Sequence, residues 1–170
     1  MSFRYIFNIL LFQFGWFACL WLGNLGGAVA VLGILIVHFY YIVKPVDRYA
    51  EVLLLIKVLA IGAVVETAYL MSGVLLRSDG LLIPPLWLLL LWVLFATTLN
   101  YSLSWLQHRQ WLAALLVIVA APASYFAGAT ISDSMSLAAS TSISLGVVGI
   151  SWAMIFPLLL RWAQRAPVRV

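Results

Sequence analysis

Glu66 is an acidic side chain deep inside an apolar stretch, residues 52–76, which is long enough to cross a membrane as a helix. An acidic residue at the centre of a bilayer costs about 2.5–3.5 kcal/mol on insertion scales, so it normally faces a bundle interior or a cavity. Helical spacing puts Gly62, Glu66 and Tyr69 on one face, where the tyrosine hydroxyl is placed to donate a hydrogen bond to the carboxyl group. Lys57 falls on another face and is not a candidate partner. Such a carboxyl group can hold a proton or a cation, or it can serve only to hold helices together.

A second polar set lies in the next long apolar segment, residues 85–107. On a regular helix one stripe of that segment carries Thr97, Asn100, Tyr101 and Ser104. At a rise of about 1.5 Å per residue, Thr97 reaches a depth similar to that of Glu66, so we expect a contact between Glu66 and Thr97 or Asn100. Interhelical hydrogen bonds of this kind contribute roughly 0.6–2 kcal/mol each. We therefore favour a packing role for Thr97, Asn100 and Ser104, while function and packing both stay open for Glu66.

The histidines and the cysteine do not form a recognisable site. Cys19 is the single cysteine, and His38 and His108 stand alone near predicted helix ends. Their spacing matches no metal-binding pattern, so we expect neither a metal nor another cofactor. The standard catalytic motifs are absent as well, which disfavours an enzyme, and no run of basic residues indicates a nucleic-acid partner.

The composition places the whole chain in a membrane. Hydrophobic residues make up 66% of the 170 residues and charged residues only 8%, whereas about a quarter of a soluble domain is charged. A transmembrane helix needs roughly 20 apolar residues. Six segments qualify, and they predict a single all-α membrane domain, residues 1–170, built as a six-helix transmembrane bundle. The expected helices are residues 5–22, 25–43, 52–76, 85–107, 111–130 and 139–162.

Glycines and basic residues in the loops predict how these helices are arranged. Gly23, Gly26 and Gly27 interrupt the first apolar stretch and predict a tight hairpin rather than one very long helix. The positive-inside rule then orients the bundle, because one side would receive every basic residue except Arg77. We therefore expect both termini in the cytoplasm. The basic residues expected on or near that side are Arg4, Lys44, Arg48, Lys57, Arg109, Arg161, Arg165 and Arg169.

Four segments carry a resemblance to a known family. They are PPLWLLLLWVLFATTLNYSLSWL, which is the most specific (residues 84–106), FQFGWFA (residues 12–18), the pattern Pro122-x-x-Tyr125-x-x-Gly128, and SWAMIFPLLL (residues 151–160). Over its whole length the chain resembles a family of small bacterial inner-membrane proteins known only as a domain of unknown function. The resemblance implies a multi-pass protein of the bacterial inner membrane that is linked to lipid metabolism. The family is associated with an aspartate at the position of Glu66 and a histidine at that of Tyr101, so the chain departs from it there.

Three functional hypotheses remain open. In the first, the protein is an accessory or lipid-associated membrane protein that assists an enzyme acting on fatty acyl chains. In the second, it is a small oligomeric transporter that uses Glu66 as a proton or cation site. In the third, it is an intramembrane enzyme that modifies a lipid with Glu66, Tyr69 and the stripe from Thr97 to Ser104. The expected partners are accordingly membrane lipids, a second copy of the chain, or a membrane enzyme.

The surroundings of Glu66 discriminate between these hypotheses. A lateral opening beside the carboxyl group favours work on lipids, because lipids enter from the side. A polar route from Glu66 to one face of the membrane favours transport. Enclosure of Glu66 among Thr97 and Asn100 favours a packing role.

Overall fold

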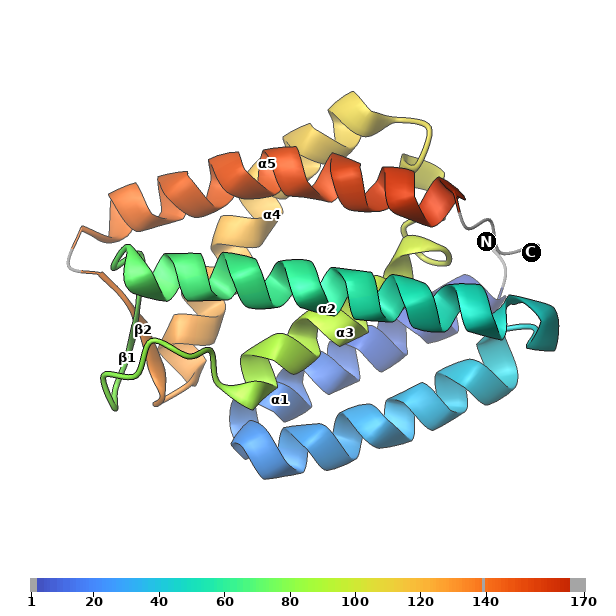
Figure 1. Cartoon of the computed structure of the whole chain (residues 1–170), viewed down its shortest axis with the longest axis horizontal. Helices are drawn as coiled ribbons and strands as arrows, with labels where there is room; N and C mark the ends of the chain where they lie inside the picture. The colour runs from blue at the N-terminus through green and yellow to red at the C-terminus, as the bar shows by residue number, and fades with distance from the viewer. Residues whose placement is uncertain (1–2, 139, 166–170) are drawn as a thin grey trace.

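The fold is helical apart from one pair of very short strands. The computed structural model describes residues 3–138 and 140–165, so the predicted helix start at Ala139 and the basic residue Arg169 lie outside the described residues. Within the described residues the helices and strands follow in the order α1, α2, β1, α3, α4, β2, α5 (Figure 1). Their bounds are α1 Phe3–Val37, α2 Arg48–Met71, β1 Leu75–Arg77, α3 Leu86–Leu99, α4 Gln110–Ile131, β2 Met135–Leu137 and α5 Thr141–Arg165. The predicted all-helical class is confirmed.

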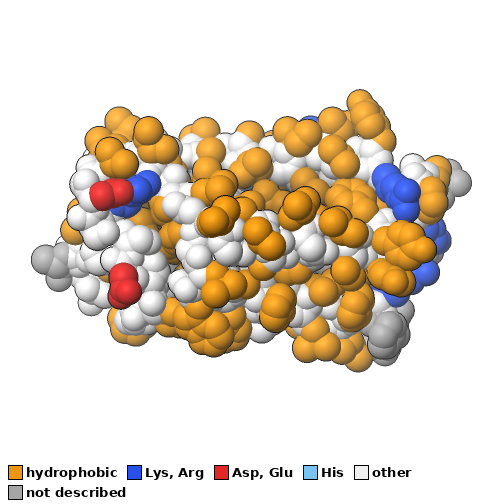
Figure 2. Space-filling model, turned by 90° about the horizontal axis from the view of Figure 1, so that it is seen from below, with side chains coloured by type: hydrophobic (Ala, Val, Ile, Leu, Met, Phe, Trp, Pro, Cys, Tyr) orange, Lys and Arg blue, Asp and Glu red, His pale blue; other side chains and the backbone are white. Residues whose placement is uncertain are grey.

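Most of the helices are long and apolar enough to cross a membrane. In the part of the chain that the structure describes, four stretches meet this condition by length and composition: Arg4–Ile42, Pro45–Met71, Gln110–Ile131 and Thr141–Gln164. Large apolar side chains cover the outside, and Leu25 and Trp111 are 80% and 88% exposed. Figure 2 shows apolar side chains spread along the middle of the molecule. A soluble monomer rarely exposes apolar patches of this extent, whereas hydrocarbon suits them.

Helix α1 folds back on itself at Gly23. This residue has φ 63° and ψ −150°, a left-handed conformation that glycine adopts without strain. The two arms, residues 3–22 and 24–37, run side by side in opposite directions (Figure 1). Glycines permit their close approach, because a Cβ atom on Gly27 would lie 3.2 Å from the Cα atom of Cys19. The expected reversal of the chain at Gly23 is therefore present.

Helix α3 is shorter than expected, and the prediction of a helix over residues 85–107 is wrong in its second half. The helix ends at Leu99, and residues 100–109 form turns with one short 3₁₀ segment. Side chains compete for the helical carbonyl groups here: Thr97 Oγ1 donates to Leu94 O at 2.6 Å, and Thr98 Oγ1 donates to Phe95 O at 2.6 Å. Such bonds weaken and bend helices. The regular stripe expected from Thr97 to Ser104 is consequently broken.

The two ends of the molecule differ in charge. The beginning of α1 and the end of α5 lie at one end, and the β1–β2 pair lies at the other (Figure 1). Lys and Arg side chains gather at the end that carries the beginning of α1 and the end of α5 (Figure 2). At the strand end, Arg77 forms an ion pair with Asp79. The hydrogen bonds from Arg77 hold the pKa of the Asp79 carboxyl group below its ordinary value. The orientation in a membrane stays a prediction, and this charge asymmetry is its basis.

Candidate functional site

Two aromatic donors hold the carboxyl group of Glu66, which is completely buried. Trp92 Nε1 on α3 donates a hydrogen bond of 2.8 Å to Glu66 Oε1. The hydroxyl group of Tyr125 on α4 donates to the same oxygen. Glu66 therefore joins α2 to α3 and α4. The prediction that Glu66 contacts Thr97 or Asn100 is therefore wrong.

Gly62 explains why Trp92 reaches the carboxyl group. A Cβ atom on Gly62 would lie 2.3 Å from Trp92 Cγ, so only glycine leaves room for the indole ring against α2. Glu66 follows Gly62 by one helical turn on the same face, within reach of the indole N–H group. Trp92 also stacks on Trp152 of α5, with ring centroids 4.7 Å apart and planes inclined by 24°. The indole is thus held between α2 and α5.

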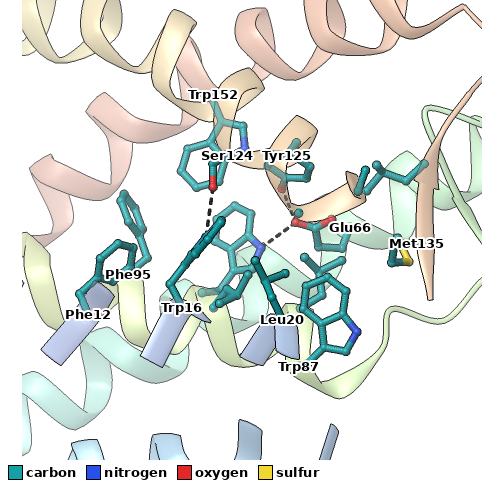
Figure 3. A pocket seen from close by; sticks show the side chains of 16 residues that line it. Phe12, Trp16, Leu20, Glu66, Trp87, Phe95, Ser124, Tyr125, Met135 and Trp152 are labelled. Atoms are coloured by element: carbon teal, nitrogen blue, oxygen red, sulfur yellow. Dashed lines mark hydrogen bonds between the residues drawn. The ribbon is translucent and has the colours of Figure 1, made fainter. Parts of the chain in front are cut away.

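The other carboxylate oxygen, Glu66 Oε2, is buried and has no hydrogen-bond partner among the described residues. Glu66 lines a cavity of about 100 Å³ (Figure 3). We call this cavity the Glu66 pocket. Apart from Glu66 its walls are almost entirely apolar, and their aromatic side chains are Phe12, Trp16, Trp87, Trp92, Phe95, Tyr125 and Trp152. A buried acceptor without a donor costs about 1–3 kcal/mol, so Oε2 is a ready position for a hydrogen bond from a ligand.

The wall of the Glu66 pocket that the first arm of α1 and α4 form includes a residue exposed at the surface. Ser124 lines the pocket and is exposed on α4. Trp16 Nε1 on α1 donates a hydrogen bond of 3.2 Å to Ser124 Oγ, and Figure 3 shows this bond beside the pocket. Since both helices are of transmembrane length, this wall lies along the side of the helix bundle.

Tyr69 belongs to the same region but has another partner. Its hydroxyl group forms a hydrogen bond with Ser151 on α5, so the expected bond from Tyr69 to Glu66 is wrong. The ring of Tyr69 meets that of Tyr125 edge to face, with centroids 5.8 Å apart. The sequence did contain a signal for Tyr125, because a tyrosine within an apolar transmembrane segment needs a hydrogen-bond partner for its hydroxyl group.

A second buried polar cluster lies nearer the end of the bundle that carries the beginning of α1. His38 Nε2 lies 3.0 Å from Glu51 Oε1, and Asn100 Nδ2 donates a bond of 3.1 Å to Glu51 Oε2. Gln107 Nε2 in turn donates to Asn100 Oδ1 at 3.2 Å. We call these four residues the His38–Glu51 cluster. Glu51 precedes Glu66 by about 22 Å along α2, so the two sites are separate.

Sequence reasoning missed this cluster for two reasons. The expected helix began at Val52, which left Glu51 outside it, whereas α2 begins at Arg48 and buries Glu51 completely. His38 was expected to stand alone, and it is also completely buried. Within residues 3–138 and 140–165, no three His, Cys, Asp or Glu side chains lie close enough together to hold a metal ion.

The predicted site residues of the α3 segment lie with this second cluster and not with Glu66. Asn8 on α1 connects to the segment, because its Nδ2 atom donates to Thr97 O at 3.1 Å and its Oδ1 atom accepts from Ser102 Oγ at 2.7 Å. The ring of Tyr101 meets that of His38 edge to face at 5.2 Å. Ser104 Oγ donates to Tyr101 O at 2.7 Å, which stabilises the turns after α3.

Comparison with known proteins identifies one relationship. The model of a family described as "Protein of unknown function (DUF2878)" matches residues 5–158 of the chain. Neither the curated proteins nor the solved structures contain a match.

Proposed function

The chain belongs to the DUF2878 family, a family of proteins of unknown function, and we propose that it is a lipid-associated membrane protein whose Glu66 pocket binds one amphiphilic molecule. In this role it assists membrane lipid metabolism in a bacterial inner membrane. One observation carries the proposal: Glu66, whose buried Oε2 atom has no hydrogen-bond partner among the described residues, lines a cavity with almost entirely apolar walls. Ligand sites typically combine apolar walls with a few polar groups of this kind.

The proposed arrangement in the membrane has six crossings with both termini in the cytoplasm. The two arms of α1 supply two crossings, and α2, α4 and α5 supply one each. Helix α3 spans about 21 Å, so it crosses only together with the turns of residues 100–109. Basic side chains at the end that carries the beginning of α1 support a cytoplasmic location of that end.

A small oligomeric transporter is the second candidate. The early end of helix α3 at Leu99 favours this candidate, because transporters often bind substrates where a transmembrane helix is interrupted. In this candidate Glu66 would hold a proton or a cation. The lateral, apolar character of the Glu66 pocket supports the lipid-associated function more directly. The enzyme hypothesis loses support, because Tyr69 bonds Ser151 instead of Glu66.

Substitution of a glycine in the pocket wall tests the proposed function. Gly128 lines the pocket, and its nearest neighbour, Leu20 Cδ2, would be 3.7 Å from an added Cβ atom, so a leucine fits the backbone but occupies the pocket. Gly33 is the matched control, because nothing lies within 4 Å of a Cβ atom there. Mass spectrometry of co-purified small molecules should detect a ligand with the wild type and Gly33→Leu but not with Gly128→Leu. The same ligand on all three proteins would contradict the proposal.

Membrane lipidomics tests the link to lipid metabolism separately. A deletion strain and a strain with Glu66→Gln should both show an altered lipid profile relative to the wild type. The Gly33→Leu strain should match the wild type. An unchanged lipid profile in the deletion strain would overturn the role in lipid metabolism. It would not decide whether the pocket binds a ligand, which the mass spectrometry experiment tests.

A further inference from the structure

We propose that the molecule bound in the Glu66 pocket is an amphiphilic amine, whose protonated nitrogen binds Glu66 Oε2 and whose hydrocarbon chain leaves between α1 and α4. This inference rests on the proposed binding function and names the class of ligand. It is carried by the charge, the aromatic walls and the dimensions of the pocket.

An ionised Glu66 would have no counter-charge among the described residues. Among the described residues Arg77 forms an ion pair with Asp79 and His38 lies within hydrogen-bond distance of Glu51, and neither contact involves Glu66. Lys57 is exposed on α2 and does not reach the carboxyl group. Burying a carboxylate without an opposite charge is strongly unfavourable. A cationic ligand offsets this cost, whereas a carboxylate or phosphate group would be repelled.

Aromatic rings surround the position that the cation would take. Four tryptophans, Trp16, Trp87, Trp92 and Trp152, line the pocket together with Tyr125. Figure 3 labels all of these except Trp92. The face of an aromatic ring attracts an ammonium group, and tryptophan does so best. The walls therefore favour a cation over a neutral polar group of the same size.

The hydrogen bonds at Glu66 specify the kind of ammonium group. Oε1 already accepts bonds from Trp92 Nε1 and the Tyr125 hydroxyl group, which fixes the orientation of the carboxyl group. Oε2 is the acceptor that is left. A cation that binds it through a hydrogen bond must carry an N–H group, so a primary, secondary or tertiary ammonium fits and a quaternary one does not.

The size of the pocket requires the remainder of the ligand to lie outside it. The cavity measures about 100 Å³, and an engineered apolar cavity of ~150 Å³ admits benzene. The enclosed space thus accommodates the amine and the first few carbon atoms. In this proposal the chain passes the Trp16–Ser124 bond and continues between α1 and α4 into the lipid.

Tryptophan fluorescence can rank three probes on the full-length protein in lipid nanodiscs. The probes are an alkyl amine, an alcohol and a carboxylate with the same chain, each carrying a bromine atom, which quenches nearby tryptophans. We expect the amine to bind about tenfold more tightly than the alcohol, and the carboxylate to bind most weakly. The variant Glu66→Gln should bind the amine no better than the alcohol, while Gly33→Leu should behave as the wild type.

The outcomes separate this inference from the proposed function. Equal binding of amine and alcohol to the wild type would overturn the assignment of an amine and leave the pocket as a lipid site. Persistence of the amine preference in Glu66→Gln would also overturn it. Absence of saturable quenching by all three probes would overturn the binding function itself. The ranking on the wild type needs no variant, so it decides the question even where Glu66→Gln does not fold.

Discussion

The indole ring of Trp92 lies against Gly62 on α2 and donates its N–H group to Glu66, one helical turn further along the same face. This relationship has three consequences: it brings α2 and α3 close together, it fixes one oxygen of the carboxyl group, and it leaves the other oxygen without a partner among the described residues. The position of a glycine thereby determines the orientation of an acidic side chain.

Replacement of Gly62 by alanine should destabilise the protein by about 1–3 kcal/mol, because the added methyl group requires Trp92 to move. The clash is severe, since the new Cβ atom would lie 2.3 Å from Trp92 Cγ. Unfolding in mixed detergent micelles, followed by tryptophan fluorescence, measures the change. Gly33→Ala is the control, because its Cβ atom meets nothing within 4 Å. Equal stability of the two variants would show that Trp92 does not depend on Gly62.

The His38–Glu51 cluster should contribute strongly to stability. The substitution Glu51→Ala leaves the side chains of His38 and Asn100 buried without their acceptor, at about 1–3 kcal/mol for each. The same unfolding assay detects this loss. Asp79→Asn breaks an exposed ion pair and should lower the unfolding midpoint at neutral pH much less than Glu51→Ala does. A wild-type midpoint for Glu51→Ala would show that the cluster is not required for folding.

The loop after β1 should respond to acid through Asp79. Hydrogen bonds from Arg77 and from the Leu81 amide group hold the pKa of Asp79 below its ordinary value. An acid with a lowered pKa in the folded state stabilises that state above its ordinary pKa, and the contribution disappears as the pH falls through the lowered pKa. The amide proton of Leu81 should therefore shift in NMR spectra with a midpoint below that of a free aspartate. A midpoint at or above that of a free aspartate, or the same titration in Asp79→Asn, would contradict this cause.

The predicted orientation can be tested by labelling with a membrane-impermeant maleimide. Cys19 is completely buried, so it should not react and need not be removed. Ser78→Cys lies in the exposed loop at the strand end and should be labelled on intact cells. His108→Cys is exposed in the turns after α3 and should be labelled only in permeabilised cells. The opposite pattern would place the termini outside the cytoplasm.

The parts of the fold that could be predicted from the sequence depend on strong local physical constraints. The reversal at Gly23 was predictable because few other residues adopt its backbone conformation. The burial of Glu66 was predictable because hydrocarbon excludes an acidic side chain, and helical spacing alone put Gly62 on the same face.

The partners of Glu66 could not be predicted in the same way. The depth comparison that selected Thr97 used only its distance along the helix and not the face of α3 on which it lies. Thr97 lies within α3 as expected, but its hydroxyl group donates to Leu94 O. The true partners, Trp92 and Tyr125, are aromatic residues, and in the sequence they do not differ from those that face lipid. Their selection depends on how α3 and α4 are rotated, which only the packed structure determines. Glu51 was missed because the start of a helix is difficult to locate from sequence.

A high-resolution experimental structure of the protein in lipid nanodiscs tests the central claim most directly, because it shows what Glu66 Oε2 contacts. We predict elongated density that enters between Trp16 of α1 and Ser124 of α4 and ends at hydrogen-bond distance from Oε2. A collapsed pocket in which a protein side chain bonds Oε2 would contradict the account and make Glu66 a packing residue.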